Sequence, residues 1–190
     1  MKSTSGILVA LFVFAYSISA QSITNDTVRE RIRSAQAGKS IELIFDETGR
    51  TTKLMAVSEG FAKDEVGSAG LLAMSFALGC IYPGDSLAKS PETYLFTFWV
   101  LTKKPRFGEN HTMTAALKEE MLVVGSARYV AKPREQMEYL NFEISRDHLA
   151  KIASQSDVRF MLGDETFTFT GSQLKLIASV LAITEVSDQR

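Results

Sequence analysis

Large and small side chains alternate through the middle of the chain. Residues 66–84 carry no charge, and the large side chains fall on every second position. Side chains of a pleated strand point to opposite faces in turn, so this alternation predicts a strand. The alternative is a membrane-spanning helix, for which nineteen uncharged residues that include several Gly and Ser are barely long enough. The large-residue face of the predicted strand holds Leu72, Met74, Phe76, Leu78, Cys80 and Tyr82.

Further strands are predicted on both sides of this one. Residues 94–101 are apolar at almost every position, which is typical of a central strand covered on both faces. Residues 158–162 and the alternating Phe167 and Phe169 flank a two-residue Gly163–Asp164 turn, which predicts a hairpin in which Phe160 faces Phe167. The other predicted strands are residues 41–45, 53–57, 113–118, 121–131 and 137–144, and the turn at residues 46–49 places Gly49 where positive φ is tolerated.

Three helices are predicted from apolar periodicity and capping signals. Residues 27–37 begin with Thr27 and Glu30 at capping-box spacing. Ser145 is a good N-cap for a helix that runs to about residue 154. Thr170 and Gln173 form a second capping-box pair before the apolar residues 174–183.

These elements predict an α+β domain. We expect an antiparallel β-sheet or sandwich of about seven to nine strands, with one N-terminal and two C-terminal helices packed on it. Residues 21–190 are long enough for one domain with a substantial core.

Residues 1–20 have the three parts of a secretory signal peptide. Lys2 supplies a positive start, residues 6–16 are apolar, and small residues precede a polar residue at the predicted cleavage site between Ala20 and Gln21. The apolar stretch is too short to cross a bilayer comfortably, so an uncleaved anchor is the less favoured alternative. We therefore expect a secreted or periplasmic protein.

Composition narrows the classes of function. Removal of residues 1–20 leaves 20 basic and 22 acidic residues, and this near-neutral balance argues against nucleic-acid binding and against attraction to an anionic membrane. Cys80 is the only cysteine, so no intrachain disulfide can form, and its place within a strand predicts a buried structural thiol. The two histidines show no metal-ligand spacing, and we expect no metal or other cofactor.

One short motif suggests catalysis. Residues 84–87 (Gly-Asp-Ser-Leu) resemble the nucleophile block of the GDSL-type esterases and lipases. The resemblance implies a parallel α/β sheet, Ser86 as the nucleophile, and residues 108–110 as an imitation of the family's glycine–asparagine block. The late D-x-x-H motif of the family does not occur in the chain, and neither His111 nor His148 stands in one. Because nucleophilic catalysis needs an oriented base, an esterase is the alternative hypothesis.

The loop at residues 102–112 gathers positive charge at the end of the most hydrophobic strand. Lys103, Lys104, Arg106 and His111 are therefore the candidate ligand-binding residues, for an acidic ligand or partner. The competing interpretation is a solvated turn that keeps the sheet from aggregating through its edge.

Two sequons are present. Asn25 and Asn110 each stand two residues before a threonine, in or next to predicted loops, where glycosylation is sterically plausible in a eukaryotic secretory pathway.

The leading hypothesis is an exported, non-catalytic protein with a binding or structural role. Its partner is unknown from sequence: a protein, or a small apolar ligand held between helices and sheet, are both open because the chain is rich in phenylalanine. We expect no nucleic acid as partner and no stable membrane insertion after signal cleavage.

Overall fold

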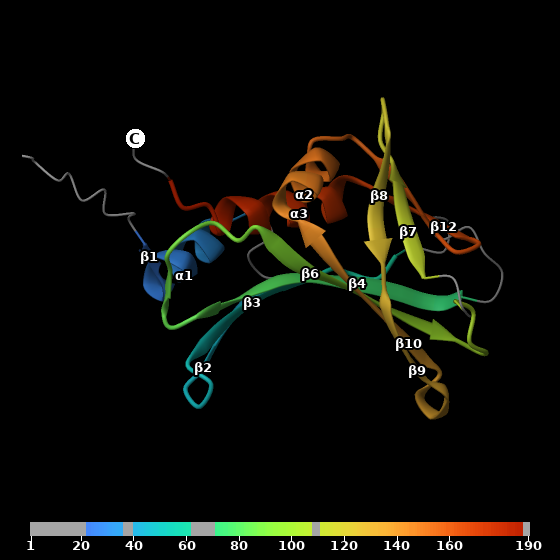
Figure 1. Cartoon of the computed structure of the whole chain (residues 1–190), viewed down its shortest axis with the longest axis horizontal. Coiled ribbons are helices and arrows are strands. Elements are labelled where there is room, and N and C mark those ends of the chain that lie inside the picture. The colour runs from blue at the N-terminus through green and yellow to red at the C-terminus, as the bar shows by residue number, and fades with distance from the viewer. Residues whose placement is uncertain (1–21, 36–39, 62–70, 108–110, 188–190) are drawn as a thin grey trace, which may run out of the picture.

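The described part of the chain forms an antiparallel α+β structure. The computed structural model describes residues 22–35, 40–61, 71–107 and 111–187. Within these residues lie twelve strands in three sheets and three α-helices, which confirms the predicted fold class with somewhat more strands than the predicted seven to nine (Figure 1).

The largest sheet has six strands in the order β2-β3-β4-β6-β10-β9, and every neighbouring pair is antiparallel. It forms the lower layer of the molecule in Figure 1 and is called the floor below. The strands are β2 (Ile41–Asp46), β3 (Thr51–Val57), β4 (Leu71–Pro83), β6 (Thr93–Thr102), β9 (Arg128–Lys132) and β10 (Met137–Ser145).

A four-stranded sheet and the helices lie on one side of this floor (Figure 1). The smaller sheet has the order β12-β11-β7-β8, and a two-stranded sheet pairs β1 with β5. The remaining elements are β1 (Ile23–Thr24), β5 (Ser86–Leu87), β7 (Thr112–Ala116), β8 (Met121–Ser126), β11 (Val158–Leu162), β12 (Glu165–Phe169), α1 (Asn25–Ser34), α2 (Arg146–Ala153), α3 (Gly171–Ile183) and the 3-10 turn η2 (Pro133–Glu135).

Phenylalanines fill the space between the two larger sheets. The ring of Phe76 on β4 stacks on Phe169 of β12 with centroids 4.7 Å apart, and the Phe98 ring of β6 lies 5.4 Å from the ring of Phe167. Aromatic rings at such distances contribute attraction beyond the area they bury. This cluster therefore joins the two sheets into one core.

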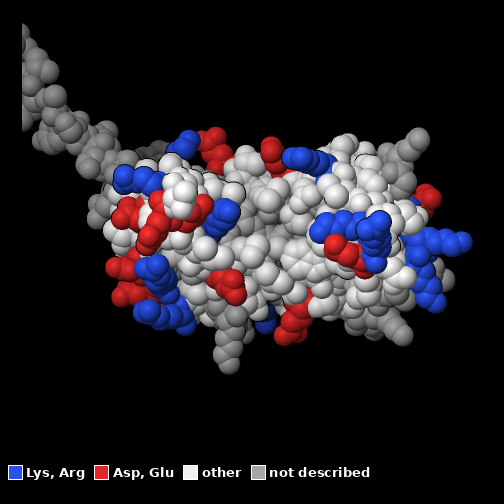
Figure 2. Space-filling model, turned by 90° about the horizontal axis from the view of Figure 1, so that it is seen from below, with Lys and Arg blue, Asp and Glu red and all other residues white. Residues whose placement is uncertain are grey.

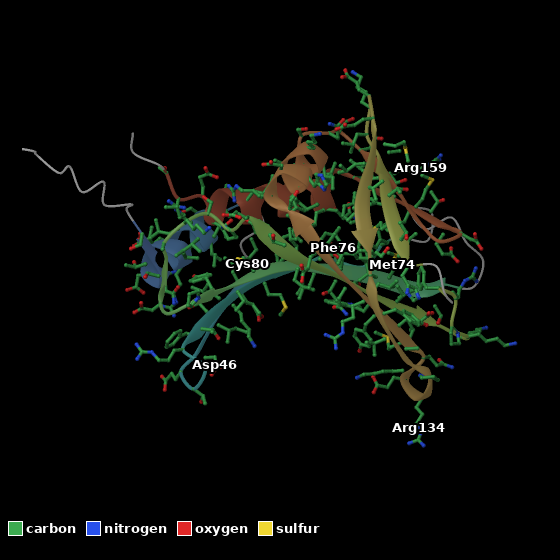
Figure 3. The ribbon with its side chains drawn as sticks, in the orientation of Figure 1. Asp46, Met74, Phe76, Cys80, Arg134 and Arg159 are labelled. Atoms are coloured by element: carbon green, nitrogen blue, oxygen red, sulfur yellow. The ribbon has the colours of Figure 1, made fainter. Side chains whose placement is uncertain are left out.

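The alternation in β4 is confirmed. Met74, Phe76 and Cys80 are buried and point toward the helices and the second sheet (Figure 3), and the small residues between them face the opposite side. Residues 66–70 and the side chain of Leu72 lie outside the described residues.

The C-terminal predictions are also confirmed. Phe160 pairs with Phe167 across the β11–β12 hairpin, and their rings stack with centroids 5.4 Å apart. The Ser145 hydroxyl caps α2 by accepting from the backbone N–H of His148 at 3.2 Å. Thr170 and Gln173 form the predicted capping box at the start of α3, in which the Gln173 side chain accepts from the backbone N–H of Thr170 at 3.0 Å.

The prediction that residues 94–101 are covered on both faces is wrong. Phe96 and Phe98 of β6 are fully buried on the inner face, whereas the intervening Leu95 is 46% exposed. Trp99 and Leu101 on the same outer face are partly exposed. All three helices and the second sheet of the described residues lie on one side of the six-stranded sheet, so no described element covers the outer face of β6 (Figure 1).

Three local predictions are corrected. The first helix begins at Asn25 with Thr24 as its N-cap, not Thr27, and Asn25 is held there by tertiary hydrogen bonds. The positive φ in the β2–β3 turn is at Arg50 (φ 46°) and not at Gly49.

The predicted strand at residues 121–131 divides into β8 and β9, which belong to different sheets. The division follows Gly125, whose φ of 134° is open to glycine and strained for other residues.

Candidate functional site

The positive charge of the loop after β6 is partly neutralised by an ion pair with a residue of another strand. Lys103 and Lys104 are exposed and line a shallow hollow of about 370 Å³ together with Pro105 and Arg106. The Arg106 guanidinium, however, lies 2.7 Å from the carboxylate of Glu165, a residue that is only 4% exposed. Arg106 is itself exposed, but its charge is paired with a buried carboxylate, so Lys103 and Lys104 contribute most of the unneutralised positive charge of the loop.

A second buried carboxylate, Glu138, organises this loop. It is 1% exposed and accepts from the Thr102 hydroxyl at 2.9 Å and from the backbone N–H groups of Arg106 and Phe107 at 3.0 and 3.3 Å. The Tyr129 hydroxyl donates a further bond at 2.7 Å. Burial of a charge is tolerated when its lone pairs are satisfied in this way.

Tyr129 and His111 complete the cluster. Burial raises the pKa of Tyr129 to about 12, and the hydrogen bond to Glu138 and the negative charge of Glu138 add to this effect. The phenol therefore stays protonated and donates its hydrogen bond to Glu138. The His111 ring stacks on the Tyr129 ring with centroids 4.3 Å apart. The structure thus brings Arg106 and His111 to one cluster, whose hydrogen bonds anchor the loop.

Glu138 could have been found from the sequence. In β10 the buried positions alternate, and Leu140, Phe142 and Ile144 place the same face at position 138. A carboxylate on the core-facing register of a strand indicates a buried acceptor.

The residues of the GDSL resemblance form a turn against α1. Ser86 lies in β5 and pairs with Thr24 of β1 in an antiparallel sheet, where the resemblance implies a parallel one. The carbonyl of Gly84 accepts from the Thr52 hydroxyl at 2.6 Å, and the carbonyl of Asp85 accepts from the backbone N–H of Asn25 at 2.9 Å. The histidines lie elsewhere: His111 is stacked on Tyr129, and His148 lies in the first turn of α2.

Asn25, the first sequon residue, is not available for glycosylation in this fold. It is 6% exposed, its amide donates to the Thr52 hydroxyl at 3.0 Å, and its carbonyl accepts from the Tyr82 hydroxyl at 2.7 Å. Asn110 lies outside the described residues, as do Ala20 and Gln21 of the predicted cleavage site.

Cys80 is buried, as the sequence predicted, and burial raises the pKa of its thiol to about 12. In the described ranges, no cluster of three or more His, Cys, Asp and Glu side chains is suited to hold a metal ion. Among the described helices, none is long and apolar enough to cross a membrane.

One of the hollows among the described residues opens between the helices and the six-stranded sheet, and its wall is of mixed polar and apolar character. This hollow of about 420 Å³ lies where β3 ends and α3 begins. Its lining residues are Ser40, Val57, Ser58, Glu59, Gly171, Ser172, Gln173, Lys175 and Leu176.

The outer face of the six-stranded sheet exposes several large hydrophobic side chains. Figure 2 looks onto it: charged side chains gather toward its two ends and the middle is mostly uncharged. Asp46 and Arg134 mark the two hairpins that project below the sheet on either side (Figure 3). Eight large hydrophobic residues are exposed in the described part of the chain, and five of them lie on this face, namely Ile44, Met55, Ile81, Leu95 and Val130.

Comparisons with known proteins add no relative. No protein-family model, no curated protein and no solved structure matches this chain significantly.

Proposed function

We propose that the chain is an exported, non-catalytic protein that works by binding a protein partner through the outer face of its six-stranded sheet. The observation that carries this proposal is β6, which is apolar on both faces but covered on one. Side chains such as Leu95, 46% exposed, and Ile81, 62% exposed, gain free energy when a partner removes them from water.

The basic loop is the weaker candidate. Arg106 is paired with Glu165, and Glu138 fixes the loop backbone, which leaves Lys103 and Lys104 as the exposed charges of the loop that form no ion pair with another described residue. Two lysines on a solvated turn also fit the role of keeping a sheet edge soluble. The sheet face therefore has the stronger claim.

The proposal is tested by thiol labelling in intact cells of the host. Because Cys80 is buried, Ile81→Cys adds a single accessible thiol on the outer face. Val123→Cys on β8 is the matched control, since Val123 is 60% exposed and Ile81 is 62% exposed. The reagent is a maleimide that cannot cross the cytoplasmic membrane.

We expect the thiol at position 123 to be labelled in intact cells and the thiol at position 81 to be protected. Both should react equally in dilute purified protein. Equal labelling of both positions in cells would rule out a bound partner on this face. Labelling of neither before lysis would instead contradict export.

A further inference from the structure

The outer face carries a ridge of large side chains beside a furrow of small ones. The ridge is the outer row of β6 from Leu95 to Leu101. The furrow is the part of the outer row of β4 from Ala73 to Gly79, beyond which the row ends at the large, exposed Ile81. The two rows are in register, so each ridge residue lies beside a furrow residue: Leu95 beside Gly79, Thr97 beside Ala77, Trp99 beside Ser75, and Leu101 beside Ala73.

We infer that the partner on this face is a second copy of the same chain. This inference rests on the proposed function. A two-fold axis that runs parallel to the strands, midway between β4 and β6, lays the ridge of each copy into the furrow of the other. Leu95 then meets the Gly79 position of the second copy, and Trp99 meets Ser75. Interdigitation of large and small residues is how packed sheets reach the density of a protein interior.

The charges that flank the ridge and furrow agree with the same axis. Lys53 on β3 and Glu143 on β10 are exposed and lie one strand outside β4 and β6, on opposite sides. The axis therefore places β3 of one copy over β10 of the other. In the register of the sheet, Lys53 lies level with Ile81, whereas Glu143 lies level with Leu95 and therefore with Gly79. Because Gly79 and Ile81 are two positions apart on β4, the two charges are offset along the strands by about 7 Å.

The long and flexible side chains of Lys53 and Glu143 can span an offset of this size. The next strands outward repeat the pattern. Glu42 on β2 and Arg128 on β9 are both exposed, carry opposite charges, and are again offset by two positions. A second copy thus meets opposite charges at four places.

The face is also large enough. Six strands span about 25 Å and the ten residues of β6 extend about 33 Å, which gives an area of the order of 800 Å². A stable interface buries about that much of each partner.

The test measures the dimer dissociation constant of the exported full-length protein by sedimentation velocity. The emission of Trp99, the single tryptophan of the chain, reports burial of the ridge as concentration rises. Lys53→Glu and Glu143→Lys each create two like-charge contacts, so each should raise the dissociation constant at least about tenfold. Lys175→Glu on α3, an exposed site away from this face, is the charge-matched control and should leave it unchanged.

A mixture of the two variant proteins tests whether positions 53 and 143 face each other in the dimer. In a mixed dimer of Lys53→Glu with Glu143→Lys, both contacts pair opposite charges again, so the mixture should dimerise about as tightly as wild type. A dimer whose affinity ignores these variants would place the interface elsewhere and overturn the inference.

A wild-type protein that stays monomeric at high concentration would also overturn it. If Ile81→Cys were nevertheless protected in cells, the face would bind a different protein, and the proposed function would stand. If Ile81→Cys were labelled freely as well, both would be wrong.

Discussion

The two faces of the six-stranded sheet are built from the same strands, but the inner face is buried and the outer face is exposed. On the inner face of β4 and β6, Phe76, Phe96 and Phe98 are fully buried against phenylalanines of the second sheet. On the outer face, Leu95 and Ile81 remain in contact with water. Side chains of comparable hydrophobicity are thus placed in both environments, and what differs is the presence of a covering layer. The inner face stabilises the chain, whereas the outer face is available to stabilise an assembly.

The contrast also concerns polar groups. The inner face admits polar side chains where donors or acceptors surround them, as for Glu138, and no described buried side-chain polar atom lacks a hydrogen-bond partner. The outer face imposes no such condition, because water satisfies any group there. Substitutions on the two faces should therefore differ in cost even between neighbours on one strand.

Neighbouring thiols on β4 should show the largest difference. At pH 8 a thiol with a pKa of about 12 has about 1,000-fold less thiolate than one with the ordinary value of 9.0, and burial blocks access as well. In Ile81→Cys, we expect an aromatic disulfide reagent to modify the new thiol within minutes and Cys80 only after denaturation. Wild-type protein is the control and should take up no label before unfolding; rapid labelling of wild type would mean that the inner face opens readily.

Truncation of a core ring should cost the most stability. Phe76→Ala removes a fully buried ring that stacks on Phe169, so we expect a loss of about 3–5 kcal/mol in the free energy of unfolding. Ile81→Ala on the outer face of the same strand should change it by less than about 1 kcal/mol, measured with dilute protein in urea. Similar losses for the two variants would contradict the assignment of the faces.

Removal of one charge should have an intermediate effect. Glu138→Gln keeps the shape of the side chain but turns an acceptor into an amide N–H₂ that faces donors, among them the Phe107 N–H and the Tyr129 hydroxyl. We expect a loss of about 1–3 kcal/mol by chemical denaturation. Glu143→Gln, the same change on the exposed face of β10, is the control and should be close to neutral in dilute protein. A neutral Glu138→Gln would show that the buried carboxylate is dispensable.

Local patterns explain which parts of the fold were predictable. The Phe160–Phe167 pairing follows from a two-residue turn, and the capping of α2 follows from Ser145, since both depend on residues close in sequence. The start of α1 was missed because Asn25 is fixed by Thr52 and Tyr82, which are distant in sequence.

The candidate site was predictable only in part. The sequence located a basic loop, but it could not show that Arg106 pairs with Glu165, because that contact requires the two sheets to be packed. The sequence of β6 indicated correctly that both faces are apolar. It could not indicate that the described elements of the chain cover only one of them, since an apolar side chain has the same identity whether its neighbour comes from its own chain or from another.

The smallest predicted effect on stability belongs to Leu95→Ser. Leu95 is 46% exposed and lies on the uncovered face, so its loss should change the free energy of unfolding of dilute protein by no more than about 0.5 kcal/mol. The same substitution removes a ridge residue, so we expect it to weaken self-association in concentrated protein, because the apolar contact is lost only in the assembly. Thr168→Ser on β12, a partly exposed residue of the other sheet, should leave both quantities unchanged. If Leu95→Ser destabilised the dilute monomer as strongly as Phe76→Ala, the outer face would already be covered within one chain, and the difference between the two faces would not exist in solution.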